Sequence, residues 1–115
     1  MCQEIENREH LFIICFRVQN CFEVCRKIMG EYLEKDIDSK EILYLAFNNR
    51  NKKRLTCTLW FAVKVMYKIY QNRFINKSQL LRDIVKEIDW NLEMNTKLGS
   101  KYGIQGLKNL IVQQL

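Results

Sequence analysis

Residues 55–70 read LTCTLWFAVKVMYKIY, and this stretch decides the fold class. Its apolar side chains recur at helical spacing with few polar ones between them, which predicts a helix that is apolar almost all round. Such a helix belongs at the centre of a fold. The residues assigned to one of its faces are Leu55, Leu59, Ala62, Val63, Met66, Ile69 and Tyr70, and those between them include Trp60, Phe61 and Val65.

An apolar stripe nearer the amino terminus predicts a second long helix. Gly30 lies near the end of this stripe and is predicted to mark a point where the helix stops and restarts. The polar residues 34–39 are predicted to form a loop. We expect the helices over 18–33 and 55–70 to pack together as the centre of the fold. The stripe consists of Leu11, Ile14, Cys15, Val18, Cys21, Phe22, Cys25, Ile28, Met29, Tyr32 and Leu33.

The remaining segments predict shorter helices. The run NNRNKKR at residues 48–54 is the most polar part of the chain and is predicted to connect two helical halves. Asp38 or Ser39 can cap a short helix before it, and Asn76 or Ser78 can cap a longer one after it. The expected apolar residues of that longer helix are Leu81, Ile84, Val85 and Ile88. After it we expect a turn bracketed by Gly99 and Gly103. The last apolar stripe consists of Ile104, Leu107, Leu110 and Ile111.

Composition supports an all-α fold, a small irregular bundle of four to six helices. The chain has 115 residues, no proline and four glycines, so residues that break helices are nearly missing. With 48% hydrophobic and 28% charged residues it is typical of a globular domain. The longest apolar runs are far shorter than the ~18 residues of a membrane span, and the polar, acidic first ten residues are unlike a secretory signal. We therefore expect an intracellular protein, nuclear or cytoplasmic, that does not enter a membrane.

Positive charge is concentrated in the second third of the chain. Residues 42–82 contain no Asp or Glu and nine Lys or Arg, so the net charge of +6 belongs to this segment. Such a segment attracts a phosphate backbone, which predicts sequence-independent binding of RNA or DNA, and Trp60, Tyr67 and Tyr70 could stack on unpaired bases. Alternatively, Trp60 and Tyr70 are core residues and the lysines are the solvated face of a buried helix. The candidate nucleic-acid-binding residues are Arg50, Lys52, Lys53, Arg54, Lys64, Lys68 and Arg73.

The single histidine and two cysteines form a candidate metal site at the amino terminus. Cys2, His10 and Cys15 are separated by seven and four residues, and thiolate and imidazole are the ligands that zinc prefers. A fourth ligand would have to be water or a neighbouring thiol such as Cys21, so zinc binding would be weak. Alternatively, Cys15, Cys21 and Cys25 are small core residues on the apolar stripe, and His10 covers its start.

The residues around this site carry a family resemblance. Cys2, Glu6, His10, Leu11, Phe12 and Cys15 resemble the second half of the zinc knuckle that follows the polymerase region of non-LTR (LINE-type) retrotransposon reverse transcriptases. The resemblance covers about fifteen residues closely, and the helical remainder only in general character. It implies a truncated knuckle over residues 1–15 followed by a single helical domain over 16–115.

Two departures from the family pattern stand out. The first cysteine of the knuckle would fall three residues before Cys2, which is before Met1, so one ligand is missing. The residue after the last cysteine is often proline in the family and is Phe16 here. The resemblance implies that a tail of this kind helps to hold template RNA or target DNA for a polymerase that lies outside this chain.

Catalytic chemistry finds no support in the residues. A polymerase needs paired aspartates for two magnesium ions, and the chain has no Asp-Asp pair. The nearest candidates, Asp36 with Asp38 and Asp83 with Glu87 and Asp89, fit caps and solvent-facing charges better. We therefore expect a non-catalytic nucleic-acid-binding fragment. The alternatives are a helical protein-interaction module whose apolar stripes dock a partner helix, which could be that of a second copy of the chain, and a decayed reading frame without a selected function.

Overall fold

The computed structural model describes residues 16–72, 74–93 and 101–115, and over these residues the only regular secondary structure is α-helix. This confirms the all-α expectation and its range of four to six helices. None of the described helices has the length and hydropathy that a membrane crossing requires. The five helices are α1 (Phe16–Leu33), α2 (Ser39–Leu43), α3 (Lys52–Gln71), α4 (Lys77–Glu93) and α5 (Lys101–Gln113).

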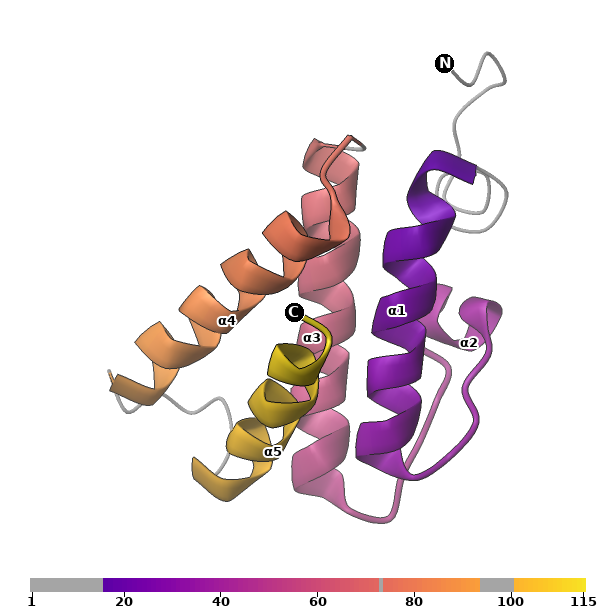
Figure 1. Ribbon diagram of the computed structural model, residues 1–115. Helices are drawn as coiled ribbons and strands as arrows, with labels where there is room; N and C mark the ends of the chain where they lie inside the picture. Colours follow the sequence, from indigo (N-terminus) through magenta and orange to yellow (C-terminus); the bar gives the residue numbers. More distant parts are fainter. Residues whose placement is uncertain (1–15, 73, 94–100) are drawn as a thin grey trace.

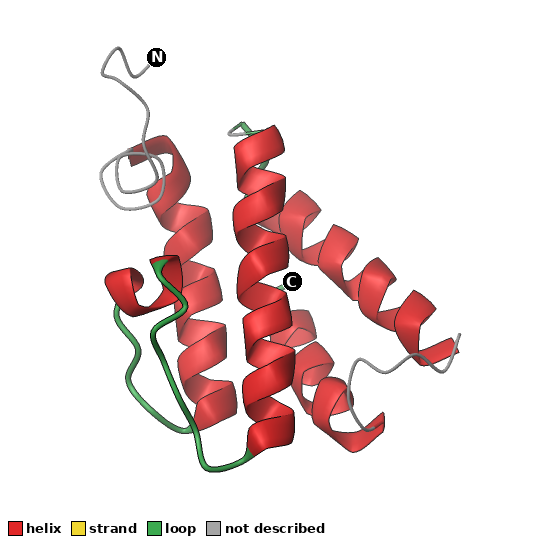
Figure 2. Ribbon diagram, turned by 180° about the vertical axis from the view of Figure 1, so that it is seen from behind, coloured by secondary structure: helices red, strands yellow, loops and turns green. Residues whose placement is uncertain are grey.

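The two long helices α1 and α3 run antiparallel, side by side, and form the centre of the fold, as the sequence predicts (Figure 1). Helix α4 crosses α3 obliquely, and α5 packs against α1, α3 and α4. The short helix α2 and the loops on either side of it lie at the rear, next to α1 (Figure 2). The result is an irregular bundle with one core.

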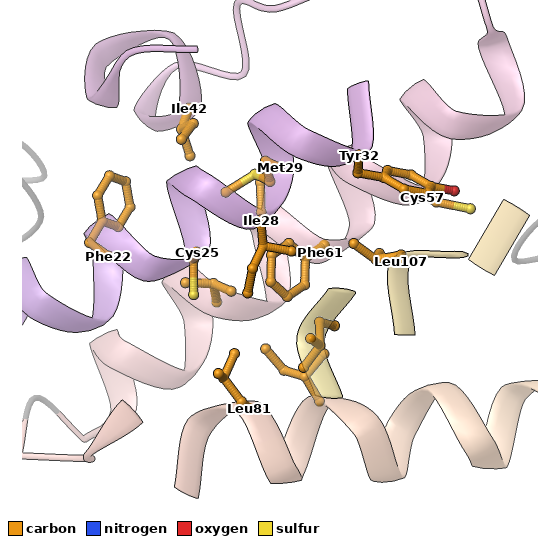
Figure 3. Packing of buried hydrophobic residues seen from close by; sticks show 14 of the residues in the cluster. Phe22, Cys25, Ile28, Met29, Tyr32, Ile42, Cys57, Phe61, Leu81 and Leu107 are labelled. Atoms are coloured by element: carbon orange, nitrogen blue, oxygen red, sulfur yellow. The ribbon is translucent and has the colours of Figure 1, made fainter. Parts of the chain in front are cut away.

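The core lies where α1, α3, α4 and α5 meet (Figure 3). Each helix contributes side chains spaced by three or four residues, which is the pattern that a helix buries on one side. Among the fully buried side chains are Phe22, Ile28 and Met29 of α1, Phe61 and Ile69 of α3, Leu81, Ile84 and Ile88 of α4, and Leu107 of α5.

The buried side of α3 differs from the predicted one. Phe61 and Val65, which the sequence analysis placed between the face residues, are fully buried, whereas Val63 and Tyr70 of the predicted face are 48% and 73% exposed. The true buried side is rotated by about a quarter of a turn from the predicted one. Because α3 is apolar almost all round, periodicity fixes that it is a helix but only poorly which side is inside.

Helix α1 does not stop at Gly30 but continues to Leu33. It ends where Glu34 takes a positive φ of 55° and the N–H of Lys35 donates to the carbonyl of Gly30 at 3.0 Å. These contacts form a Schellman-type helix end in which a glutamate occupies the left-handed position. A Cβ at residue 30 would lie only 3.1 Å from the Lys35 carbonyl oxygen, so this glycine permits the close approach of the returning chain.

Side-chain caps fix the starts of the following helices. Asp38 caps α2 in a capping box with Glu41, and the amide oxygen of Asn51 accepts a hydrogen bond from the N–H of Arg54 at the start of α3. The predicted connector at 48–54 is therefore a loop only as far as Asn51, and its last three residues form the first turn of α3. Asn76, immediately before α4, accepts from the N–H of Gln79 at 2.8 Å.

The two glycines expected to bracket a turn have different outcomes. Gly103 lies inside α5, which begins at Lys101, so it does not bound a turn, and Gly99 is outside the described residues. Ile104, Leu107 and Ile111 of the predicted last stripe are buried, and Leu110 packs against the core.

Candidate nucleic-acid interface

Three of the predicted nucleic-acid-binding residues cluster at the amino-terminal end of α3. Arg50 lies in the loop before the helix, Lys52 and Lys53 lie in its first turn, and all three are exposed. The Lys52 ammonium donates to the side-chain oxygen of Asn48 at 3.1 Å, which leaves its charge uncompensated. No carboxylate of the described residues forms an ion pair with these three cations. We call this group the α3 cationic cluster.

Arg54 is the next residue along the chain but has a different environment. Its guanidinium donates to the carbonyl oxygen of Tyr32 at 2.9 Å, lies 5.3 Å from the centre of the Tyr32 ring, and approaches Glu34 at 3.8 Å. These contacts tie the first turn of α3 to the last turn of α1, a role in stability that the sequence analysis did not foresee. Charge alone did not separate Arg54 from its basic neighbours.

We expect Arg54→Ala to lower the free energy of unfolding by about 1–2 kcal/mol, because it removes a charge-assisted hydrogen bond and a cation–π contact that are partly exposed. Urea unfolding followed by circular dichroism measures this loss. The matched control is Lys53→Ala, which removes an exposed cation from the same turn and should change stability by less than about 0.5 kcal/mol. Equal effects of the two changes would contradict the assigned role of Arg54.

The remaining predicted cations lie farther along the chain. Lys64 forms an ion pair with Glu87 of α4, with 3.5 Å between Nζ and Oε1, so part of its charge is compensated. Glu87 is thus half-buried between helices and not on an open solvent face as expected. Lys68 is half-buried in the last turn of α3, and Arg73 lies outside the described residues.

The three aromatic residues near these cations have different exposures. Trp60 packs against the core and is half-buried, whereas Tyr67 and Tyr70 are 56% and 73% exposed. The alternative reading of Tyr70 as a core residue is therefore wrong. Tyr67 also accepts a hydrogen bond from Gln71 on the same helix at 3.1 Å. Exposed rings of this kind can stack on unpaired bases or fill a protein interface.

The candidate metal residues Cys2, His10 and Cys15 lie outside the described residues, and zinc binding there stays a prediction. Cys21, suggested as a fourth ligand, is buried, and its thiol donates to the carbonyl of Ile75 at 3.5 Å. Burial raises the pKa of the Cys21, Cys25 and Cys57 thiols, which opposes the thiolate form that zinc binds. Within the described part of the chain no three His, Cys, Asp or Glu side chains come together as metal ligands would.

Four of the five carboxylates weighed as catalytic candidates have structural partners, and the fifth, Asp36, is exposed in the loop before α2. Asp38 is the cap of α2, and Asp83 accepts a hydrogen bond from Gln79 one turn earlier on α4. Asp89 forms an ion pair with Lys108, which links α4 to α5. The structure therefore places these four carboxylates in caps and helix contacts, as the sequence analysis favoured for Asp38.

One surface feature has no counterpart in the sequence analysis. A groove of about 340 Å³ lies between the end of α2 and the outer side of α3, and its lining includes Tyr44, Leu45, Val63, Met66, Tyr67 and Tyr70. The spacing of Val63, Met66 and Tyr70 indicated an apolar side of α3, but the sequence analysis assigned these residues to the core.

Comparisons of the chain with protein families, with curated proteins and with solved structures found no match.

Proposed function

We propose that this chain binds RNA or DNA without sequence preference, through phosphate contacts from the α3 cationic cluster. The observation that carries the proposal is the exposure of Arg50, Lys52 and Lys53 at one helix end, inside a 41-residue segment that has no acidic residue. The amino-terminal end of α3 adds the positive partial charge of its helix dipole, which favours a phosphate at the same place.

A strip along α3 extends this interface. Lys53, Trp60, Lys64, Tyr67 and Gln71 recur at spacings that keep them on one side of the helix. From the first to the last of them the helix rises about 27 Å, long enough for several nucleotides. Lys64 contributes less than a free lysine because Glu87 shares its charge. Tyr67 offers an exposed ring for a base, which favours single-stranded partners.

The resemblance of residues 2–15 to the knuckle of non-LTR reverse transcriptases supports the same proposal, because in that family such a tail holds template RNA or target DNA. In this proposal the chain has no catalytic role of its own and acts in the nucleus or the cytoplasm, where its nucleic-acid partners are. Zinc bound by Cys2, His10 and Cys15 would order the amino terminus but is not required for the phosphate contacts.

A salt series with labelled single-stranded RNA tests the proposal. We expect binding at low salt, and we expect Arg50→Ala/Lys52→Ala/Lys53→Ala to weaken it at least tenfold. Three lost phosphate contacts should also reduce the slope of log K against log salt by about 2, since each contact to a single strand contributes about 0.7.

The control variant removes the same number of positive charges from another part of the surface. Lys27, Lys35 and Lys86 are exposed lysines outside the cluster, and their triple alanine variant should bind within about twofold of the parent chain if position matters as well as total charge. If both triple variants lose the same affinity, the α3 cationic cluster is not the binding site. If the parent chain does not bind at low salt, the function is not nucleic-acid binding.

A further inference from the structure

Thr56 stands out among the four Ser and Thr residues in the described part of the chain. It is exposed on α3, whereas Thr58 is buried and Ser39 and Ser78 are half-buried. An exposed aliphatic hydroxyl is the group to which a Ser/Thr protein kinase attaches a phosphate. Accessibility therefore singles out Thr56 as the acceptor for such a modification.

The residues that precede Thr56 have the charge pattern of a kinase substrate. Lys52, Lys53 and Arg54 stand four, three and two positions before it, within a segment that has no acidic residue between positions 42 and 82. Kinases select substrates partly by their charge pattern, and a kinase with acidic groups in its substrate groove binds segments with cations just before the acceptor. The basic run thus indicates the class of kinase that would recognise Thr56.

The Thr56 side chain lies next to the α3 cationic cluster. Its hydroxyl donates a hydrogen bond to the carbonyl oxygen of Lys52, one turn earlier, at 2.9 Å. Side chains of a helix lean toward its amino terminus, and residues three and four positions apart are neighbours on its surface. A phosphate on Thr56 would therefore lie beside Lys52 and Lys53, two of the three cations of the cluster.

We propose that Thr56 is a phosphorylation site for a kinase that selects basic segments, and that its phosphate suppresses nucleic-acid binding at the α3 cationic cluster. The γ-phosphoryl group of ATP passes to Oγ1 of Thr56: its bond to the bridging oxygen of ADP breaks, a new P–O bond forms, and the hydroxyl proton leaves to a base of the kinase. The effect on binding rests on the function proposed above, whereas the modification itself does not.

The charge of the phosphate accounts for the expected suppression. Phosphothreonine carries about −1.5 to −2 charges at pH 7, and the cluster has three cations. The modification therefore offsets about half or more of the positive charge of the cluster. Phosphate oxygens also form charge-assisted hydrogen bonds with ammonium groups, so Lys52 and Lys53 would contact this phosphate instead of a nucleic-acid backbone.

The start of α3 must open locally before a kinase can act. In the helix, the cations before Thr56 point in different directions, and the guanidinium of Arg54 donates to the carbonyl oxygen of Tyr32. Thr56 is only the fifth residue of α3, and the fully buried residues of this helix begin after it, at Cys57. Helix ends open at a lower free-energy cost than helix interiors, and Asn51→Ala, which removes the cap, should raise the rate of phosphorylation severalfold.

Phosphorylation is tested on the purified chain with ATP, Mg²⁺ and a purified Ser/Thr kinase that is active on a basic reference peptide. Mass spectrometry locates the phosphate. We expect one phosphate per chain at Thr56 and none at that position in Thr56→Val, which keeps the shape of the side chain. Ser78→Ala is the matched control and should leave the incorporation unchanged, because Ser78 lies in the first turn of α4 without a run of cations before it. No phosphate on the chain, or phosphate on another residue in place of Thr56, would overturn the assignment.

The effect on binding is measured with labelled single-stranded RNA at low salt. The phosphorylated chain should bind at least tenfold more weakly than the unmodified chain, and removal of the phosphate by a phosphatase should restore the affinity. Lys86→Glu is the matched control for net charge, because it also changes the charge by two units but on an exposed position of α4, and it should bind within about twofold of the parent chain.

Equal RNA binding by the phosphorylated and unmodified chains would overturn the regulatory effect. Failure of the unmodified chain to bind RNA would instead contradict the function proposed above and remove the regulatory effect with it. The mass spectrum decides in either case whether Thr56 accepts a phosphate, so the two failures are distinguishable.

Discussion

Replacement of Phe61 by alanine is expected to lower the free energy of unfolding by about 3–5 kcal/mol, the cost of removing a large aromatic side chain from a packed core. Phe61 is fully buried in the middle of α3, in the region where α1, α3 and α5 meet (Figure 3). A domain of this size has roughly 5–15 kcal/mol of stability in total, so the variant should be marginally folded at room temperature. Urea unfolding followed by circular dichroism measures the difference.

Tyr67→Ala is the control for this experiment. Tyr67 lies six residues later on the same helix but on its exposed side, so its loss should change stability by less than about 0.5 kcal/mol. If Phe61→Ala costs less than about 1 kcal/mol, or if Tyr67→Ala costs as much, α3 is rotated relative to the arrangement described above.

A second large effect is expected from raising the pH. Burial raises the pKa of the Cys25 thiol well above its ordinary value, with Cys21 nearby raising it further, and burial also raises the pKa of the Cys21 and Cys57 thiols. A thiol in the unfolded chain loses its proton above about pH 8.5. The folded state therefore binds more protons than the unfolded state above that pH, and stability falls as pH rises.

Between pH 7.5 and pH 9.5 this loss amounts to about 1.4 kcal/mol for a thiol that stays protonated in the fold, as the fully buried thiol of Cys25 does, and the raised pKa values of Cys21 and Cys57 add to it in the same direction. Urea unfolding at both pH values, in the presence of a reductant, measures it. Cys25→Ala should lose about 1.4 kcal/mol less than the parent chain over this interval. Identical pH dependence in the two chains would show that Cys25 is accessible to water.

The sequence predicts the helices of this fold better than their orientation. Apolar residues spaced by three and four predicted α1, α3 and the buried positions of α4 and α5, because residues with that spacing lie on one side of a helix. The end of α1 was placed too early, since Gly30 is helical and Glu34 instead takes the left-handed conformation. That outcome depends on the path of the following loop, which spacing along a helix does not contain.

At the candidate site, too, the sequence predicts some features, whereas others depend on how the helices pack. Exposure of Arg50, Lys52 and Lys53 agrees with a polar run before a helix, but Arg54 of the same run turns toward Tyr32. Which cation contacts the neighbouring helix depends on the packing of α1 against α3. The groove between α2 and α3 was missed for a related reason: α3 has more apolar surface than the core buries, and only the arrangement of its neighbours determines which part remains outside.

The position of α5 has a consequence for the order in which the chain folds. Ile104, Leu107 and Ile111 are buried, and their helix touches α1, α3 and α4, although α1 is synthesised long before it. Contacts between segments far apart in sequence form late, because the intervening chain must first be brought together. On the ribosome the apolar residues of α1, α3 and α4 that α5 covers would stay exposed until α5 emerges, and transiently exposed apolar surface of this kind favours aggregation.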